Sequence, residues 1–286
     1  MPVLDQAWKS WLTFNRDRGC TPESMIEAMT QAGFHHAAAQ AAVHESAETN
    51  GSTDSAKAVT ANDMPSEYQY DASPAATCNV IKAWDKHVNV LARCDRPELI
   101  VFGNVLTDEE CDEMIERSRY RIRPSTIVDP VTGTEEVITD RTSQGIWFHR
   151  GEDELIARLE RRFADLMNCP VENGEGLQVL HYAVGAEYRP HFDYFSPSQS
   201  GSNVHLNRGG QRVATLVVYL NDVQSGGETV FPEIAMSVVP RRGNAVYFRY
   251  MNGARQLDPL TLHGGAPVTE GEKWIMTKWV REHAYG

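Results

Sequence analysis

Short runs in which apolar and polar residues alternate fill the second half of the chain. This pattern, with a period of two, is typical of strands that bury one face. Glycine-containing turn clusters at 225–227 and 242–244 separate some of the runs. Strands are predicted at 99–102, 177–184, 213–220, 237–239, 245–250 and 274–280. Because no helix is predicted between the later ones, the pattern indicates a mainly β protein with an antiparallel sandwich or barrel.

Helical periodicity occurs in two segments of the main domain. One follows Thr107 and begins with a capping box, because Thr107 and Glu110 can each bond to the other's main-chain amide. Apolar residues three or four positions apart predict a second helix over 155–166. Three arginines are expected on its opposite side, namely Arg158, Arg161 and Arg162. We expect both helices to flank the sheet.

The first 78 residues differ from the rest in composition. Threonine, proline and glutamate at 21–23 predict the start of a helix, and alanines over 37–43 predict another. Residues 45–61 are small and polar, which is typical of a linker. We therefore predict a small helical region at 1–44, a polar linker at 45–78 and a main domain at 79–286.

Composition and charge disfavour several classes of function. The 286 residues carry a formal net charge of -12, which disfavours binding to nucleic acid phosphates. No apolar run approaches the ~20 residues of a membrane span, and no basic segment followed by an apolar one opens the chain. Five scattered cysteines without a C-x-x-C pair argue against a disulfide framework and a zinc knuckle. We expect reduced thiols, no membrane partner and a cytoplasmic location.

Candidate chemistry begins with His191-Phe192-Asp193 and with His263, which follows later in the chain. On an extended strand, residues two positions apart share a face, so His191 and Asp193 can bind the same ion. Two imidazoles and one carboxylate leave three adjacent positions open, as in non-haem iron oxygenases. The alternative interpretation is a hydrogen bond between His191 and Asp193 without a metal.

Lys273 strengthens the interpretation as an oxygenase. Trp274 and Ile275 set the alternation of a strand in which Lys273 is expected to point inward. A buried lysine needs an anion, and a dicarboxylic cosubstrate would supply one.

Three segments, 182–193, 215–232 and 263–279, resemble the catalytic domain of prolyl 4-hydroxylases. These enzymes are Fe(II)- and 2-oxoglutarate-dependent dioxygenases, and the resemblance covers roughly residues 97–282. It implies a double-stranded β-helix (jelly-roll) core. It also implies residues for the iron, for 2-oxoglutarate and for the substrate proline, in that order: His191, Asp193 and His263; Lys273, Tyr182 and Thr229; Tyr188, Arg212 and Trp279. Arg141 matches a further recurrent motif of the family.

The implied activity is hydroxylation of prolyl residues in a peptide or protein, with decarboxylation of 2-oxoglutarate to succinate and CO2. Dioxygen is the co-oxidant and ascorbate the expected reductant, and a homodimer is an expectation from the family. Loops 129–135 and 196–210 are expected to close over the substrate, and His205 is expected to be exposed to solvent.

Several alternatives stay open at this point. An enzyme with the same mechanism would act on a free amino acid, another small molecule, a lysyl residue or a nucleic acid. A zinc hydrolase would use the same three ligands, but Lys273 and Tyr182 argue against it. A binding protein without activity is disfavoured by the intact ligand set. Thr229 is also consistent with a turn cap, Arg212 with a structural ion pair, and Trp279 with a core position.

Overall fold

The computed structural model describes residues 21–31, 34–48, 68–128, 135–136, 141–196 and 201–286, together with Leu4, Trp8 and Leu12. The chain divides into two compact units, residues 1–65 and 66–286. In the first unit, α2 (Pro22–Gln31) and α3 (His36–Glu48) pack through apolar side chains that include Met25, Met29 and Val43. Both helices were predicted. No described helix combines the length and the apolar character needed to cross a membrane.

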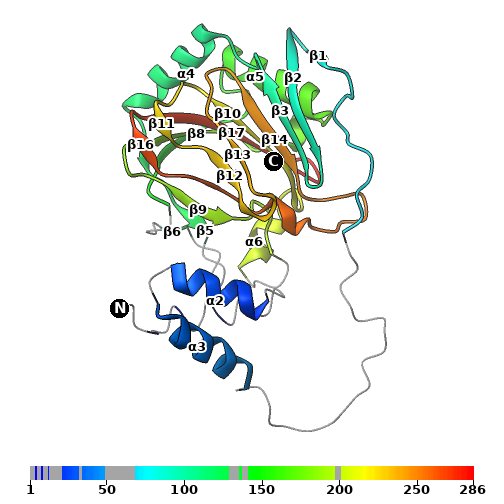
Figure 1. Cartoon of the computed structure of the whole chain (residues 1–286). Coiled ribbons are helices and arrows are strands. Elements are labelled where there is room, and N and C mark those ends of the chain that lie inside the picture. The colour runs from blue at the N-terminus through cyan, green and yellow to red at the C-terminus, as the bar shows by residue number, and fades with distance from the viewer. Residues whose placement is uncertain are drawn as a thin grey trace. The chain divides into compact units, whose positions relative to one another are not determined.

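Two facing antiparallel sheets form the second unit, and Figure 1 shows them on either side of a common interior. The larger sheet has nine strands among the described residues, in this order: β1 (Val80–Ala83), β2 (Lys86–Asp95), β3 (Glu98–Gly103), β14 (Ala245–Arg249), β10 (Arg212–Tyr219), β17 (Lys273–Arg281), β8 (Leu177–Tyr182), β7 (Gln144–Phe148) and β4 (Arg123–Pro124). The smaller sheet has the order β13 (Met236–Val238), β12 (Thr229–Phe231), β15 (His263–Gly265) and β9 (Tyr188–His191). Two short pairs complete the set, β11 (Ser225–Gly226) with β16 (Val268–Glu270) and β5 (Ile127–Val128) with β6 (Glu135–Glu136). This jelly-roll arrangement confirms the predicted fold, and each predicted strand lies within two residues of an observed one.

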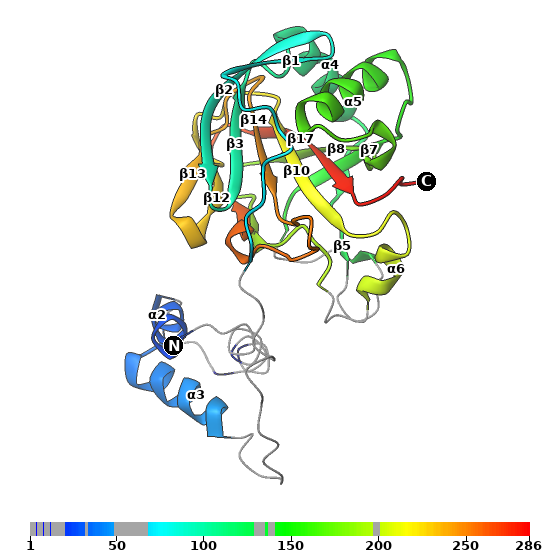
Figure 2. The same ribbon diagram turned by 90° about the vertical axis from the view of Figure 1, so that its right-hand side faces the viewer.

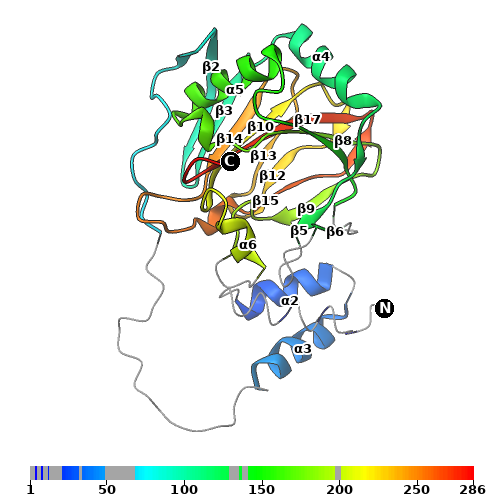
Figure 3. The same cartoon turned by 180° about the vertical axis from the view of Figure 1, so that it is seen from behind.

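Alternation along the central strands separates two cores. One face of the large sheet packs against α4 (Asp108–Arg119) and α5 (Glu154–Met167), as Figures 2 and 3 show. Leu216 and Met276 belong to this outer core. Val217 follows Leu216 and Ile275 precedes Met276, and both belong to the core between the two sheets. The same alternation turns Lys273 toward the interior of the jelly roll, which becomes important for the site below.

The capping box before α4 is present as predicted. The Glu110 amide donates to Thr107 Oγ1 at 3.2 Å, and the Thr107 amide donates to Glu110 Oε2 at 3.0 Å. We expect Thr107→Ala to lower the free energy of unfolding by about 1 kcal/mol, because a helix amide loses its acceptor. Thr107→Ser retains the hydroxyl and should remain close to the native value in urea unfolding. Equal losses in both variants would contradict the capping role.

One expectation about α5 was wrong. Arg162 was placed on the outer side of the helix, yet only 2% of it is exposed. Its Nη1 lies 2.6 Å from Glu110 Oε2, and its Nε lies 2.7 Å from Asp85 Oδ1. The charge is tolerated in the interior because two carboxylates, both distant in sequence, compensate for it.

The described end of the stretch predicted as a linker lies against the large sheet. Asp71 pairs with Arg249 of β14, and Ser73 Oγ donates to Glu98 of β3 at 2.5 Å. These bonds hold this segment against the large sheet of the second unit, to which it belongs.

Candidate active site

Strands β9 and β15 bring the three predicted metal ligands together. His191 and His263 are directly opposite each other in the antiparallel register. Asp193 lies in the bend after β9 rather than on the strand. The bend brings its carboxylate close to both imidazoles. One ligand atom from each of the three residues lies within 4.8 Å of the others. Asp193 Oδ1 is 3.5 Å from His191 Nε2, and Oδ2 is 3.5 Å from His263 Nε2.

Main-chain carbonyls orient both imidazoles. His191 Nδ1 lies 2.9 Å from the Arg189 carbonyl oxygen, and His263 Nδ1 lies 3.0 Å from that of Thr261. A protonated Nδ1 that donates to a carbonyl leaves Nε2 as the free ligand atom, directed at the space beside Asp193. Burial lowers the pKa of His263 to about 4, so the ring is neutral near pH 7, the form that binds metals.

Aromatic side chains support His263 from the interior. Its ring centroid lies 4.4 Å from that of Phe248 and 5.9 Å from that of Phe231. Both rings belong to the core between the sheets. The position of this ligand is therefore set by packing as well as by hydrogen bonding.

Asp193 is held as a carboxylate. Burial by itself would raise its pKa, but His263, His191 and Arg212 outweigh that effect and keep the pKa far below the usual range. The Thr215 hydroxyl on β10 donates to Asp193 Oδ2 at 2.6 Å. The carboxylate is thus ionised and oriented before any metal arrives.

Replacing Thr215 by valine should weaken metal binding by about 10- to 100-fold, because a hydrogen bond that orients a ligand is lost. The valine keeps the shape of the side chain and its strand preference. Metal affinity measured by calorimetry tests this, with Thr277→Val, another buried threonine of the large sheet, as the matched control. An unchanged affinity in Thr215→Val would show that the carboxylate needs no such support.

Lys273 is a buried cation at the same interior. Only 2% of the residue is exposed, and no described residue accepts a hydrogen bond from Nζ or forms an ion pair with it. Tyr182 is its direct partner in the β17–β8 register, and Nζ lies 5.1 Å from the Tyr182 ring centroid. A Cβ at Gly265 would be 3.6 Å from Nζ, so the ammonium lies beside β15, two residues beyond His263. A buried ammonium without a counter-charge fits an anionic ligand.

The opposite face of β17 shows the contrast. Lys278 is also buried, but its Nζ lies 2.8 Å from Glu160 Oε1. Among the described residues, Lys278 has an ion-pair partner and Lys273 has none within ion-pair distance.

The buried charge of Lys273 predicts how stability depends on pH. Burial lowers the pKa of Lys273 from its ordinary 10.5 to about 8, with Glu228 opposing the change. The unfolded chain therefore holds this proton more tightly, which destabilises the fold below pH 8 by ~3 kcal/mol. The cost disappears as the pH rises from about 8 to 10.5.

In protein free of ligand, we expect Lys273→Met to be more stable than the native chain at pH 7. The difference should shrink between pH 8 and 10.5 when denaturant unfolding is measured at each pH. Lys82→Met, at an exposed position of β1, is the control. A stability difference that does not change with pH would contradict the assignment.

Thr229 and Tyr182 lie near Lys273. Thr229 is buried within β12, opposite Gly265, so it does not cap a turn. Its Oγ1 accepts a hydrogen bond from the Tyr219 hydroxyl at 2.8 Å, which leaves its own proton to donate. Burial raises the pKa of Tyr182, so that its hydroxyl stays protonated.

A cleft of about 690 Å³ opens beside the metal ligands. The three predicted substrate residues all line it. Tyr188 stacks on His191 with ring centroids 3.6 Å apart, and the Arg212 guanidinium lies 4.2 Å from the Trp279 ring centroid. Arg212 also pairs with Glu175, with Nε to Oε1 at 2.7 Å, so the expected ion pair exists beside the cleft. The buried Trp279 Nε1 finds no hydrogen-bond acceptor among the described residues.

Comparison with known proteins identifies the family. The model of the 2OG-Fe(II) oxygenase superfamily matches residues 177–281. Prolyl 4-hydroxylase 5 of Arabidopsis thaliana is 42% identical over 208 residues, which cover 66% of this chain and 70% of that protein. Prolyl 4-hydroxylase 2 of the same plant is 36% identical over 211 residues, covering 66% and 69%. The chain belongs to the prolyl 4-hydroxylase family.

A solved structure supports the same assignment. The viral collagen prolyl hydroxylase of Paramecium bursaria Chlorella virus 1, determined as a complex with 2OG, has a TM-score of 0.52 and 29% identity. The alignment covers 66% of this chain and 99% of the viral one. Membership of the prolyl 4-hydroxylase family and the jelly-roll fold therefore agree.

In this member of the family, the recurrent Arg141 has a structural position. Its guanidinium lies 4.8 Å from the Tyr188 ring centroid, and Nη1 donates to the Thr126 carbonyl at 2.8 Å. Nη2 donates to Gln178 Oε1 at 3.2 Å. Arg141 thus packs against the substrate-side tyrosine while it bonds to the main chain at Thr126 and to the side chain of Gln178.

The structure describes more of the second loop expected to close over the site than of the first. Residues 129–134 of the first lie outside the described residues. In the second, residues 197–200 also lie outside them, and α6 (Ser202–Leu206) forms a short helix where only loop was expected. His205 was expected to be exposed, but it is half-buried and stacks on Phe195 with centroids 5.1 Å apart. It does not belong to the group of metal ligands.

Sequence reasoning missed Thr215 and Glu175. Thr215 interrupts an otherwise apolar strand on the face that meets the second sheet, which is a usable signal for a buried hydroxyl. Glu175 precedes the apolar strand β8 and is only 4% exposed. Nothing in its local sequence indicates that it meets Arg212, because that contact depends on the fold.

Proposed function

We propose that this protein hydroxylates prolyl residues in a peptide or protein substrate and converts 2-oxoglutarate to succinate and CO2. The observation that carries the proposal is the buried ammonium of Lys273, which lies beside the strand of His263 and has no ion-pair partner among the described residues. An enzyme of this family needs one charge for a dicarboxylate next to three metal ligands, and a zinc hydrolase does not.

His191, Asp193 and His263 would hold Fe(II) in this proposal. When bound, the iron supplies the activation of dioxygen that attack on an unactivated C–H bond requires. The protein contributes neutral imidazoles with a free Nε2 and a carboxylate that Thr215 keeps in place. Their open side faces the cleft, where Tyr188 covers His191.

Lys273 would pair with the distal carboxylate of 2-oxoglutarate. Because its pKa of about 8 lies above 7, the amine stays protonated at neutral pH even before the ligand binds. The hydroxyls of Tyr182 and Thr229 would donate hydrogen bonds to the same end. Burial of all three residues excludes water from this end of the ligand and strengthens the ion pair.

The substrate would enter through the cleft lined by Tyr188, Arg212 and Trp279. These side chains offer flat aromatic faces for a pyrrolidine ring and donors for peptide carbonyls. Ascorbate as reductant, a homodimer and a cytoplasmic location belong to the same proposal. The free thiols of Cys78, Cys94, Cys111 and Cys169 agree with a reducing location.

The proposal is tested by succinate release from purified protein given Fe(II), 2-oxoglutarate and ascorbate, with and without a proline-rich peptide. Mass spectrometry of the peptide accompanies the assay. We expect release that depends on the peptide and a product heavier by one oxygen atom. Slow release without a product would instead indicate a free amino acid or another small molecule as substrate. Tight zinc binding without succinate would overturn the oxygenase assignment.

A further inference from the structure

The cleft beside the metal ligands concentrates positive charge in an acidic protein. The chain has a formal net charge of -12. Among the described residues, five arginines line the cleft, namely Arg141, Arg150, Arg208, Arg212 and Arg281. The described acidic residues in the same lining are Glu175 and Asp193, and Asp193 is directed at the metal position. The cleft therefore carries the charge opposite to that of the chain as a whole.

Glu175 does not neutralise the arginines around it. Its carboxylate binds Arg212 through two bonds, of 2.7 and 3.0 Å, and Arg281 Nε lies 3.1 Å from Oε1. One negative charge thus faces two guanidinium groups. Arg281 is fixed further by donating to the carbonyls of Gly210 and His205, at 2.8 and 2.9 Å.

Arg150 and Arg208 bind only main-chain oxygens among the described residues. Arg150 Nη1 donates to the carbonyls of Glu172 and Tyr285, at 2.7 and 2.6 Å, and Arg208 Nε donates to the main-chain oxygen of Gly286 at 2.8 Å. Because Tyr285 and Gly286 are adjacent in the sequence, these bonds hold the two arginine side chains at neighbouring positions of the C-terminal segment. They use one nitrogen of each guanidinium, and both side chains are exposed. The other N–H groups can therefore meet a ligand.

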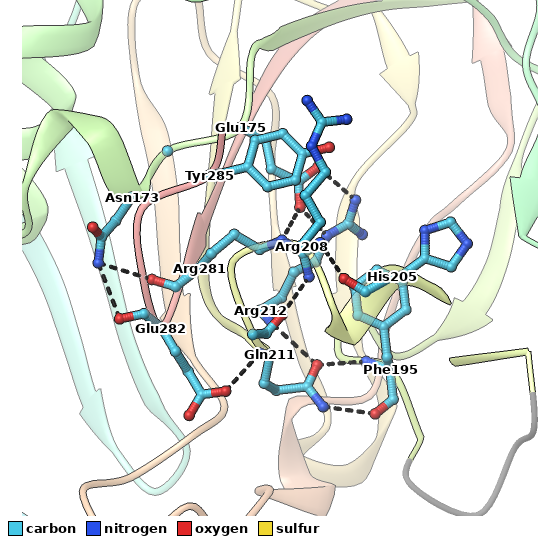
Figure 4. Close-up of polar contacts among 12 residues, drawn as sticks. Asn173, Glu175, Phe195, His205, Arg208, Gln211, Arg212, Arg281, Glu282 and Tyr285 are labelled. Atoms are coloured by element: carbon cyan, nitrogen blue, oxygen red, sulfur yellow. Dashed lines mark hydrogen bonds and ion pairs between the residues drawn. The ribbon is translucent and has the colours of Figure 1, made fainter. Parts of the chain in front are cut away.

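Aromatic rings pack against the guanidinium groups of Arg208 and Arg281. The Tyr285 ring centroid lies 4.4 Å from Arg208 Cζ and 5.0 Å from Arg281 Cζ, and Phe195 lies 5.0 Å from Arg281 Cζ. Figure 4 shows these side chains gathered around the segment that carries Gln211 and Arg212. A guanidinium that stacks on a ring keeps its N–H edge free, and this edge matches a carboxylate in shape and charge.

We propose that Arg150 and Arg208, supported by Arg281 and Tyr285, form a subsite for an Asp or Glu side chain of the peptide substrate. The inference rests on the proposed function and specifies the substrate class. Tyr188 and His191 line the same cleft as the arginines. A peptide whose proline lies at the metal ligands would therefore extend across the arginines. Lys273 does not line this cleft, which separates the subsite from the 2-oxoglutarate site.

The test uses peptides with one central proline in an alanine background and a single Asp placed in turn at each flanking position. Matched peptides carry Asn instead. Binding to the full-length, metal-loaded protein with 2-oxoglutarate is measured by anisotropy without oxygen, and kcat/KM is measured with oxygen. We expect at least about tenfold preference for Asp over Asn at one or two positions. The preference should fall as the salt concentration rises, because both arginines are exposed.

Two variants locate the effect. Arg208→Gln and Arg150→Gln should each reduce the Asp preference by about fivefold or more, while the affinity for Asn peptides changes little. Arg241→Gln removes the same charge at an exposed position between β13 and β14 and should retain the preference. Succinate release without peptide shows in every variant that the iron and 2-oxoglutarate sites are intact.

The outcomes separate the two proposals. Equal affinity for Asp and Asn peptides at every position, together with hydroxylation, would overturn the subsite and leave the proposed function in place. A preference that all three variants lose equally would also overturn it, since bulk charge would explain the result. If no peptide is hydroxylated, the proposed function fails, and a preference in binding that Arg208→Gln abolishes still supports the subsite.

Discussion

Hydroxylation by the His191→Ala variant should fall by more than about a thousandfold, below the detection limit of a mass-spectrometric assay. The substitution removes one of three groups whose ligand atoms lie within 4.8 Å, and no described His, Asp, Glu or Cys completes another such group. The fold should survive, because His191 lies at the end of β9 and bonds to a single carbonyl. Iron content after gel filtration should fall together with activity.

His181→Ala provides the control for this substitution. His181 lies on β8, where its ring contacts Trp274 in a tilted arrangement and its Nε2 lies 2.9 Å from Glu272 Oε2, outside the group of metal ligands. It should retain iron and turnover. Full activity in His191→Ala would show that the metal assignment is wrong, whatever its effect on stability.

Lys273→Ala should weaken 2-oxoglutarate binding by about a hundred- to several thousandfold. The estimate follows from the ~3–5 kcal/mol lost when one partner of a buried ion pair is removed. Metal binding should remain unchanged, because the three ligands lie on the other sheet or after it. Calorimetric titration of the metal-loaded variant with 2-oxoglutarate measures the loss directly, and the rise in KM for 2-oxoglutarate measures it in turnover.

Lys82→Ala, which removes an exposed lysine of β1, is the matched control and should bind 2-oxoglutarate like the native protein. If Lys273→Ala binds 2-oxoglutarate with native affinity, another cation must receive the distal carboxylate. The loss should also depend on charge: 2-oxoglutaramate, which keeps the 2-oxo acid end but carries a neutral amide in place of the distal carboxylate, should not distinguish the native protein from the variant.

The inward direction of Lys273 could be predicted because alternation along one strand is a local property. Trp274 and Ile275 fall on opposite faces, as expected, and the lysine follows from them. The metal ligands could be predicted as a set because two of them are neighbours in the sequence. The bend that carries Asp193 off the strand could not, since it depends on the closure of β9 against β15.

Contacts between distant residues set the limit of the prediction. The burial of Arg162 requires Asp85 and Glu110, and the position of Arg212 requires Glu175, which lies 37 residues away. Strands β1 and β2 at one end of the large sheet were also missed, because Val80 and Leu91 are apolar but exposed, so the sequence does not show which face is buried. In each case the deciding partner is supplied by the tertiary structure.

The two halves of the proposed chemistry belong to different sheets. The imidazoles extend from the small sheet, and the Lys273 side chain reaches across from the large sheet to Gly265 of β15, so the side chains packed between the sheets influence where the ammonium lies relative to the imidazoles. Facing sheets stand ~10 Å apart, and this spacing follows the volume of the side chains packed inside. Phe248, whose ring packs against His263, is one of the side chains that fill this layer. Substitutions that change the volume of this layer should therefore shift the ammonium relative to the metal ligands, even where the sheets themselves stay intact.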